Sequence, residues 1–285
     1  MFVIIGILVV IGAVIGGFLM AGGKLAVLLQ PSEFVTIIGA AIGSLLISSP
    51  LSLLKKIFKS LPQLLKSEHY SKQDYLELLK GFNDLFLLAQ RDGLLAIEKH
   101  TENPEESDIL SKNKKFLEND FAKTFFCDTM KVMLSGGVPP HELEGLIDTE
   151  IETVEVESKP VINAISKVGD AFPGLGIVAA VLGIIVTMSS IDKGAAYVGM
   201  HVAAALVGTF LGVLIAYGFV SPMASNLEVS VEHKIRYLLT IKTCIVAYAK
   251  GNPPIIAVEM ARRTIFSDER PTFSELENFM RGKTE

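Results

Sequence analysis

The stretch AFPGLGIVAAVLGIIVTMSSI, residues 171–191, contains no Asp, Glu, Lys or Arg. A helix of this length, at about 1.5 Å rise per residue, spans the roughly 30 Å hydrocarbon core of a bilayer. A second uncharged stretch, HVAAALVGTFLGVLIAYGFVS, follows at residues 201–221. Half of all residues are hydrophobic and the mean hydropathy is positive, which soluble domains rarely show. Together these observations indicate a membrane protein.

Two further apolar stretches lie toward the N-terminus. Residues 1–21 carry no charged side chain, and another uncharged run covers residues 34–54, where Lys55 and Lys56 end it. A cleaved signal peptide would need a basic leader and a shorter apolar stretch, so residues 1–21 are interpreted as a full span. The expected fold class is therefore an all-α integral membrane protein with four transmembrane helices, a helical cytoplasmic insert and a C-terminal helical tail.

The positions of Lys and Arg predict how the chain crosses the membrane. Only Lys24 lies between the first two spans and only Lys193 between the last two, while all other Lys and Arg follow residue 54 in the remaining segments. The positive-inside rule places such cation-rich segments, and hence both termini, in the cytoplasm. The expected boundaries are spans at 1–21, 34–54, 169–191 and 201–221, periplasmic loops at 22–33 and 192–200, a cytoplasmic helical domain at 55–168 and a cytoplasmic C-terminal region at 222–285.

The cytoplasmic segments have the periodicity of helices. Apolar residues recur every three to four positions in 75–89, which predicts an amphipathic helix with one buried face. Further helices are expected at about 116–134, through the acidic stretch 142–167 and at about 223–250. The polar tail from Thr264 onward is expected to be loosely held.

The sequence contains no recognisable catalytic motif. There is no Walker-type glycine loop and no G-x-S-x-G turn, so we expect neither an enzyme nor a cofactor. Cys127 and Cys244 read as ordinary reduced thiols, and no nucleic-acid patch is visible. No metal site is expected, because the five histidines lack metal-ligand spacing: His69, His100, His141, His201 and His233.

Small residues repeat every four positions in the spans. Such sets let helix backbones approach closely, either within one subunit or between subunits. They are Gly12 and Gly16, Gly39 and Gly43, and Gly208, Gly212 and Ala216. The expected spans contain no charged side chain within residues 1–21, 34–54, 171–191 and 201–221. Ion pathways through a membrane usually contain one. Either the chain conducts no ion, or a partner supplies the carboxylate.

A few polar residues and prolines mark the third and fourth spans. Pro173, Ala180 and Thr187 are spaced by seven and therefore lie nearly one above another on one face. The fourth span contains Thr209 and Tyr217. A threonine in a membrane helix most often bonds its own backbone, so spacing alone does not favour a pore-lining role.

These stretches carry a resemblance. The strings VGDAFPGLGIVAAVLG (168–183) and VGTFLGVLIAYGFVSP (207–222) resemble the last two spans of the MotA family of flagellar stator subunits. The similarity covers nearly the whole chain. It extends to GGFLMAGG (16–23), LLAIEKHTENPEES (94–107), LIDTEIETVE (146–155) and NPPIIAVEMARRTIFSDERPTFSELE (252–277).

The resemblance implies an assembly in which this chain forms the wall. A homopentamer in the membrane lipid would surround a pair of MotB-type single-span partners, and those partners would supply the membrane aspartate missing here. Ion flow would turn the ring against the rotor protein FliG. The resemblance implies that Pro173 and Pro222 couple ion flow to movement, and that Ala180, Thr187, Thr209 and Tyr217 belong to the ion pathway.

The resemblance also implies a set of charges that face the rotor. Glu98 and Glu150 belong to this set, whereas the family arginine falls at Gln90, beside Arg91. A shift of one residue turns a side chain by about 100° around a helix, so it stays open whether Arg91 takes the role. The simplest alternative is that Arg91 and Glu98 are solvated charges on one helix face.

The resemblance also bears on the coupling ion and on competing functions. Relatives that use sodium place a threonine at the position of Ala180, and alanine offers no ligand, so a proton is expected.

The alternative within the class is an ExbB or TolQ type energiser of outer-membrane processes, and GTFLGVLIAYGFVSP and NPPIIAVE favour MotA over it. A small-solute transporter would show inverted repeats or a charged or broken-helix site. A membrane scaffold is the third alternative.

Overall fold

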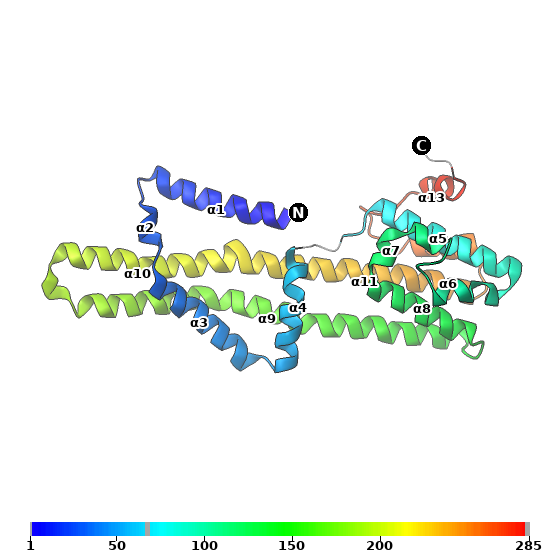
Figure 1. The fold of residues 1–285 in the computed structure, drawn as a ribbon, viewed down its shortest axis with the longest axis horizontal. Helices are drawn as coiled ribbons and strands as arrows, with labels where there is room; N and C mark the ends of the chain where they lie inside the picture. Colours follow the sequence, from blue (N-terminus) through cyan, green and yellow to red (C-terminus); the bar gives the residue numbers. More distant parts are fainter. Residues whose placement is uncertain (1, 66–68, 283–285) are drawn as a thin grey trace. The chain divides into compact units, whose positions relative to one another are not determined.

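The computed structural model describes residues 2–65 and 69–282 (Figure 1). All regular secondary structure in these residues is helical. The elements are α1 (Phe2–Met20), α2 (Leu25–Leu28), α3 (Pro31–Ser48), α4 (Leu51–Leu65), α5 (Lys72–Asp92), η1 (Leu94–Ile97), α6 (Glu98–Glu102), η2 (Leu110–Lys112), α7 (Lys114–Glu118), α8 (Asp120–Leu134), α9 (Pro140–Met188), η3 (Ile191–Lys193), α10 (Ala195–Ile215), the π-helix η4 (Ala216–Val220), α11 (Ser221–Ala249), α12 (Pro254–Arg262) and α13 (Phe273–Met280).

The chain divides into two compact units. The first comprises Met1–Ser67 and Glu157–Ser230, and the second comprises Glu68–Val156 and Val231–Glu285. Four helical stretches within the described residues are long and apolar enough to cross a membrane: Phe2–Met20, Leu25–Ser48, Pro140–Met188 and Ala195–Ala249.

The second apolar stretch, expected as one span over 34–54 with a kink near Pro50, is divided into two helices. Helix α3 begins at Pro31 and ends at Ser48, and α4 begins at Leu51. Pro50 explains the break, because a residue that precedes proline is forced out of the helical region, and Ser49 is extended with φ −129° and ψ 127°. The early start also brings Glu33, expected in a loop, into the first turn of α3.

Glycines set the contact between α9 and α10 in the first unit, where the two helices lie side by side (Figure 1). A Cβ added to Gly176 would lie 2.7 Å from the carbonyl oxygen of Gly208 and 3.1 Å from Cα of Gly212. A Cβ added to Gly12 or Gly43 would meet no described atom within 4 Å. The glycines of α10 therefore pack within the chain, whereas Gly12 of α1 and Gly43 of α3 leave open space that a neighbouring helix could fill.

The second unit has an aromatic and aliphatic core. Every apolar residue that defined the predicted helical face of 75–89 is buried in α5. Tyr70 stacks on Tyr237 of α11 with ring centroids 4.0 Å apart, and Phe86 stacks on Tyr248 at 4.1 Å. The single helix expected at 116–134 is instead divided into α7 and α8 at Asn119, whose side chain accepts a hydrogen bond from the backbone N–H of Ala122.

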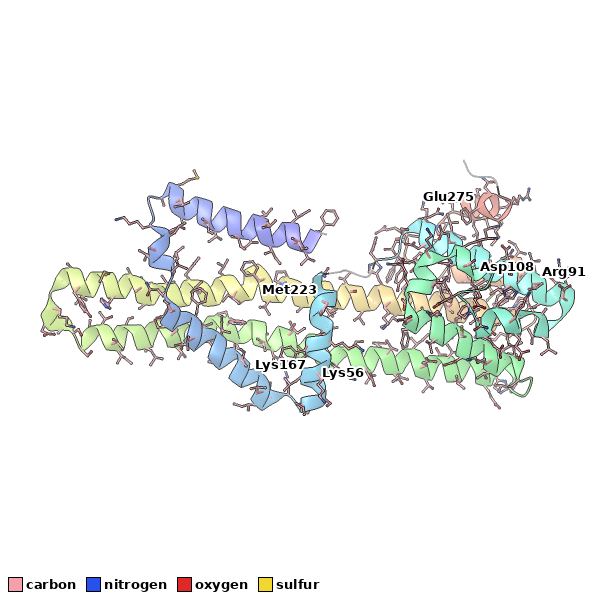
Figure 2. All side chains as sticks on the ribbon, viewed as in Figure 1. Lys56, Arg91, Asp108, Lys167, Met223 and Glu275 are labelled. Atoms are coloured by element: carbon pink, nitrogen blue, oxygen red, sulfur yellow. The ribbon has the colours of Figure 1, made fainter. Side chains whose placement is uncertain are left out.

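The C-terminal tail is packed, so the expectation of a loosely held segment is wrong for residues 264–282. Ile265 and Leu276 are almost fully buried. Thr272 caps α13, and Glu275 in its first turn pairs with Lys72 of α5 at 3.0 Å; Glu275 is labelled in Figure 2. Polar composition failed as a guide here, because two apolar side chains and a capping box are enough to fix a short helix.

We predict that Gly176→Ala destabilises the first unit, whereas Gly174→Ala on the same helix leaves it almost unchanged. The added methyl group at 176 meets backbone atoms that cannot rotate away, and such overpacking costs about 1–3 kcal/mol. At Gly174 the same methyl group meets no described atom within 4 Å. Thermal unfolding of the detergent-solubilised variants measures the difference, and equal Tm values would contradict the assigned contact.

Candidate functional site

The third-span residues Ala180 and Thr187 lie inside the first unit. Both are buried, and the backbone nitrogen of Ala180 lies 3.2 Å from a Cβ built on Gly208. The Thr187 hydroxyl donates a 2.7 Å hydrogen bond to the carbonyl oxygen of Gly183. This is the self-bonding expected of a membrane threonine, so the hydroxyl proton is already engaged.

Pro173 and Pro222 mark neighbouring places in the first unit. Pro173 lies inside α9 and has no N–H to donate to the carbonyl of Gly169. A Cβ on Gly169 would lie 3.2 Å from the side chains of both Val220 and Ser221, the residues directly before Pro222. The structure therefore brings the free carbonyl of one proline site beside the turn that leads into the other.

The helix around Pro222 is widened, not broken. The π-helical turn Ala216–Val220 joins α10 to α11, and α11 includes Pro222. In an ideal α-helix the proline ring would collide with the carbonyl of Gly218, and a π-bulge relieves such strain. Tyr217 lies in this turn and is 64% exposed, whereas Thr209, one helix earlier, is half-buried against α9.

A buried acid in this region was missed by the sequence reasoning. Glu33 is only 7% exposed, and its Oε2 atom has no hydrogen-bond partner. A Cβ on Gly208 would collide with that oxygen, and a Cβ on Gly183 would lie 3.5 Å from Oε1. Residues 34–54 contain no acid, as stated, but the apolar stretch Leu25–Ser48 of the structure begins earlier and includes Glu33, which was expected in a loop. Pro31 at a helix start with an acid in the first turn was the available signal.

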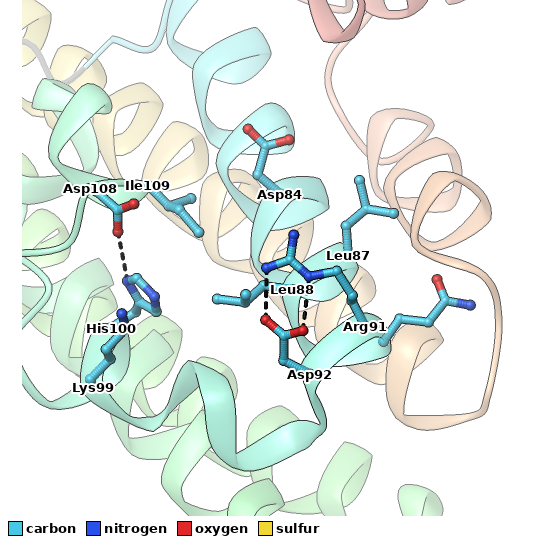
Figure 3. Close-up of a pocket in the computed structure, with 10 residues that line it drawn as sticks. Asp84, Leu87, Leu88, Arg91, Asp92, Lys99, His100, Asp108 and Ile109 are labelled. Atoms are coloured by element: carbon cyan, nitrogen blue, oxygen red, sulfur yellow. Dashed lines mark hydrogen bonds and ion pairs between the residues drawn. The ribbon is translucent and has the colours of Figure 1, made fainter.

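The residues expected to face the rotor begin at the C-terminal end of α5. Gln90 and Arg91 are exposed and line an open pocket with Asp84, Asp92 and Lys99 (Figure 3). Arg91 donates from Nε and Nη2 to the two carboxylate oxygens of Asp92, at 2.9 and 2.7 Å. This pair raises the pKa of Arg91 and lowers that of Asp92.

Glu98 belongs to a different helix from Arg91. Helix α5 ends at Asp92, and Gly93 adopts φ +91°, a conformation that side chains other than glycine rarely take. Glu98 then opens α6 with an exposed side chain. Arg91 and Glu98 are both exposed, but they do not share one helix face, because the chain turns between them.

Glu150 differs from the other charges in its surroundings. It lies on α9 in the second unit and is half-buried. Burial, followed by repulsion from Asp128, raises the pKa of its carboxyl group.

Cys127 and Cys244 are buried free thiols, as expected, and burial raises the pKa of Cys127 to about 11.

One group of side chains could hold a metal ion. His69, His233 and Glu269 place three ligand atoms within 4.8 Å of one another in the second unit. Spacing along the sequence gave no sign of this, because the three residues come from separate parts of the chain.

Comparison with known proteins places this architecture. A family model for the motility protein A N-terminal region matches residues 4–93, and the model of the MotA/TolQ/ExbB proton channel family matches residues 115–239. Motility protein A of Escherichia coli strain K12 is 40% identical over 282 residues, covering 99% of this chain and 96% of that protein. Chemotaxis protein LafT of Vibrio parahaemolyticus is 36% identical over 276 residues, covering 97% of each chain.

Solved structures share the fold. The structure of C. jejuni MotAB has a TM-score of 0.80 at 21% identity, covering 95% of this chain and 98% of that chain. The flagellar MotAB stator complex from Bacillus subtilis has a TM-score of 0.73 at 23% identity, covering 90% and 92%. With the full-length identity to the Escherichia coli protein, the four apolar helices and the two family models lead to one assignment: the chain belongs to the motility protein A group of the MotA/TolQ/ExbB proton channel family.

Proposed function

We propose that this chain is a flagellar stator subunit that, with a MotB-type partner, forms a proton channel and converts ion flow into rotation of the flagellar rotor. Full-length identity to motility proteins carries this proposal, because both family regions and nearly all of the chain align with them. The same identity favours a motility protein over an ExbB or TolQ type energiser. Deletion of the gene tests the proposal: flagella should assemble but stay paralysed.

The proposed stator contains a single-span MotB-type partner that supplies the membrane aspartate. The related solved complexes are described as MotAB. Glu33 does not remove the need for this partner, because its carboxyl group is closed in between Gly183 and Gly208. A carboxylate that alternates between ionised and protonated forms during transport must instead reach water on both sides in turn.

The proposed assembly is a homopentamer in the inner membrane, with four spans at 1–21, 34–54, 169–191 and 201–221 and both termini in the cytoplasm. The glycines that leave open space on α1 and α3 support lateral contacts with other subunits, since small residues allow close approach of helices. Exposed apolar side chains along α1, such as Leu8 and Val9, suit contact with lipid or with a neighbouring span.

In the proposed mechanism, cytoplasmic charges push the rotor protein FliG. Arg91 and Glu98 suit this role because both are exposed on either side of the Gly93 turn. The polar side chain of Gln90 lies beside Arg91 at the rim of the same pocket, so Arg91 can supply the cation that the family places one position earlier. Glu150 completes the proposed set on α9.

We expect Pro173→Ala and Pro222→Ala to leave the protein in the membrane but to abolish or severely reduce swimming. Each alanine restores a backbone N–H, which straightens and stiffens a helix at the place where the two proline sites adjoin. Pro62→Ala is the matched control, because Pro62 also lies inside a helix, α4, and is exposed. Wild-type swimming in both test variants would refute the coupling role.

Charge reversal at Glu98, alone or together with Arg91, should lower motor torque without lowering ion conduction. These exposed side chains lie outside the proposed spans, so their charge acts on the rotor and not on the ion. Torque is measured on tethered cells. Proton conduction through the channel is measured as acidification of the cytoplasm. The exposed Glu106→Lys serves as the control, and an equal fall in conduction would assign Glu98 a structural role.

Swimming speed should persist in sodium-free medium while the proton-motive force is maintained. Sodium requires several oxygen ligands as it sheds water, and Ala180 offers no side-chain oxygen. Potassium chloride replaces sodium chloride at equal ionic strength, and a protonophore should stop the cells. A collapse of speed on removal of sodium alone would show sodium coupling.

A further inference from the structure

Three side chains from separate segments of the second unit converge on one point. His69 precedes α5, His233 lies on α11, and Glu269 lies between α12 and α13. The Nδ1 atom of His69 lies 3.4 Å from Oε1 of Glu269, and the Nδ1 atom of His233 lies 3.3 Å from the same oxygen. The cluster therefore joins the segment before α5 to helix α11 and to the segment between α12 and α13.

The contacts within this cluster do not satisfy its polar atoms. His233 Nδ1 and Glu269 Oε2 are buried without a hydrogen-bond partner, although His233 Nδ1 is within ion-pair distance of Oε1. The distance is suitable but the direction is not, so the nitrogen lone pair or proton is not aimed at the oxygen. Buried polar atoms without a partner are rare in folded proteins, and an ion is one of their ordinary explanations.

The spacing matches the ligand shell of a tetrahedral metal ion. Zinc binds histidine nitrogen and carboxylate oxygen at about 2.0–2.2 Å, which makes neighbouring ligands in a tetrahedron about 3.3–3.6 Å apart. Both Nδ1 to Oε1 distances fall in this range. The three ligand atoms all lie within 4.8 Å of one another, so a small rotation of the exposed His69 would complete the face of the tetrahedron.

We propose that His69, His233 and Glu269 form a binding site for a divalent transition-metal ion such as Zn²⁺, with the fourth position open to water. Two imidazoles and a carboxylate favour such ions over Ca²⁺ or Mg²⁺, which prefer oxygen ligands alone. The side chains of Glu269 and His233 are 8% and 16% exposed, whereas His69 is 62% exposed. The two inner ligands are therefore held in place, and the ion enters from the solvent side at His69.

Neighbouring side chains hold the inner ligands without competing for them. The Phe266 ring packs edge-on against His233, with centroids 5.6 Å apart and planes at 80°. The guanidinium of Arg236 lies over the Phe266 ring, 4.4 Å from its centroid, and donates from Nη1 to the carbonyl oxygen of Thr264, while its Nε atom is buried without a hydrogen-bond partner. Neither arginine nitrogen forms a hydrogen bond or ion pair with Glu269 in the described residues, so Oε2 of Glu269 is left for the ion.

A bound ion would tie the entrance of α5 to α11 and to the segment before α13. Because the ligands gather only in the folded chain, binding would stabilise the second unit in proportion to the ion concentration. The proposed effect concerns the cytoplasmic unit and does not depend on ion conduction through the membrane.

The test uses the full chain, purified in detergent together with its co-expressed partner and stripped with a chelator. Zn²⁺ is titrated in competition with a fluorescent zinc indicator, and Co²⁺ is added separately to record its visible absorption. We expect one ion per chain, the intense visible bands of tetrahedral Co²⁺, and a rise in Tm with added Zn²⁺. His69→Gln should weaken Zn²⁺ binding at least tenfold and remove the rise in Tm, because one of three ligands is lost.

The variants are chosen so that misfolding cannot explain the result. His69 is exposed, so the metal-free variant should still fold, and the comparison rests on the rise in Tm that added Zn²⁺ causes in each protein. His141→Gln, an exposed histidine on α9 outside the cluster, is the matched control and should bind like the wild type. Equal Zn²⁺ affinity in the wild type and in His69→Gln would overturn the proposal. A Tm that does not rise with added Zn²⁺ would also overturn it.

Discussion

The close approach of the α9 and α10 backbones is the contact on which the first unit depends. In lipid, apolar side chains gain nothing by leaving the solvent, so helices associate through packing that small residues permit. Gly176, Gly208 and Gly212 supply this packing, and each would place a Cβ against backbone of the opposite helix. In the same unit, the two proline sites lie beside each other and the Glu33 carboxyl group lies against Gly183 and Gly208.

Much of the fold can be predicted from local sequence patterns, because uninterrupted apolar length and helical spacing depend only on neighbouring residues. Uncharged length identified the apolar helices, and the threefold to fourfold spacing identified the buried face of α5. The errors arose where a single residue interrupts a pattern. Asn119 caps a new helix inside a periodic stretch, and a capping box at Thr272 orders a polar tail, whereas a kink near Pro50 was expected and the structure has a full break there.

The candidate sites were less accessible to sequence reasoning, because they depend on residues that meet only in three dimensions. The proline positions and the self-bonded Thr187 followed from the chain itself and from the family resemblance. The Glu33 carboxyl group lies against Gly183 and Gly208, two positions without side chains, and no spacing rule predicts this contact. His69 and His233 likewise gave no metal signature, since the segments that bring them to Glu269 are fixed by the aromatic core of the second unit.

The buried carboxyl group of Glu33 lies in the space that side chains at Gly183 and Gly208 would otherwise occupy. The space that a methyl group would need at Gly208 is already filled by Oε2, and the space at Gly183 borders Oε1. The sizes of these three residues are therefore coupled: a relative with alanine at the place of Gly208 has room only for a shorter acid at the place of Glu33. Evolution can alter this part of the wall by compensating exchanges of volume, and substitutions at these positions should appear together in the family.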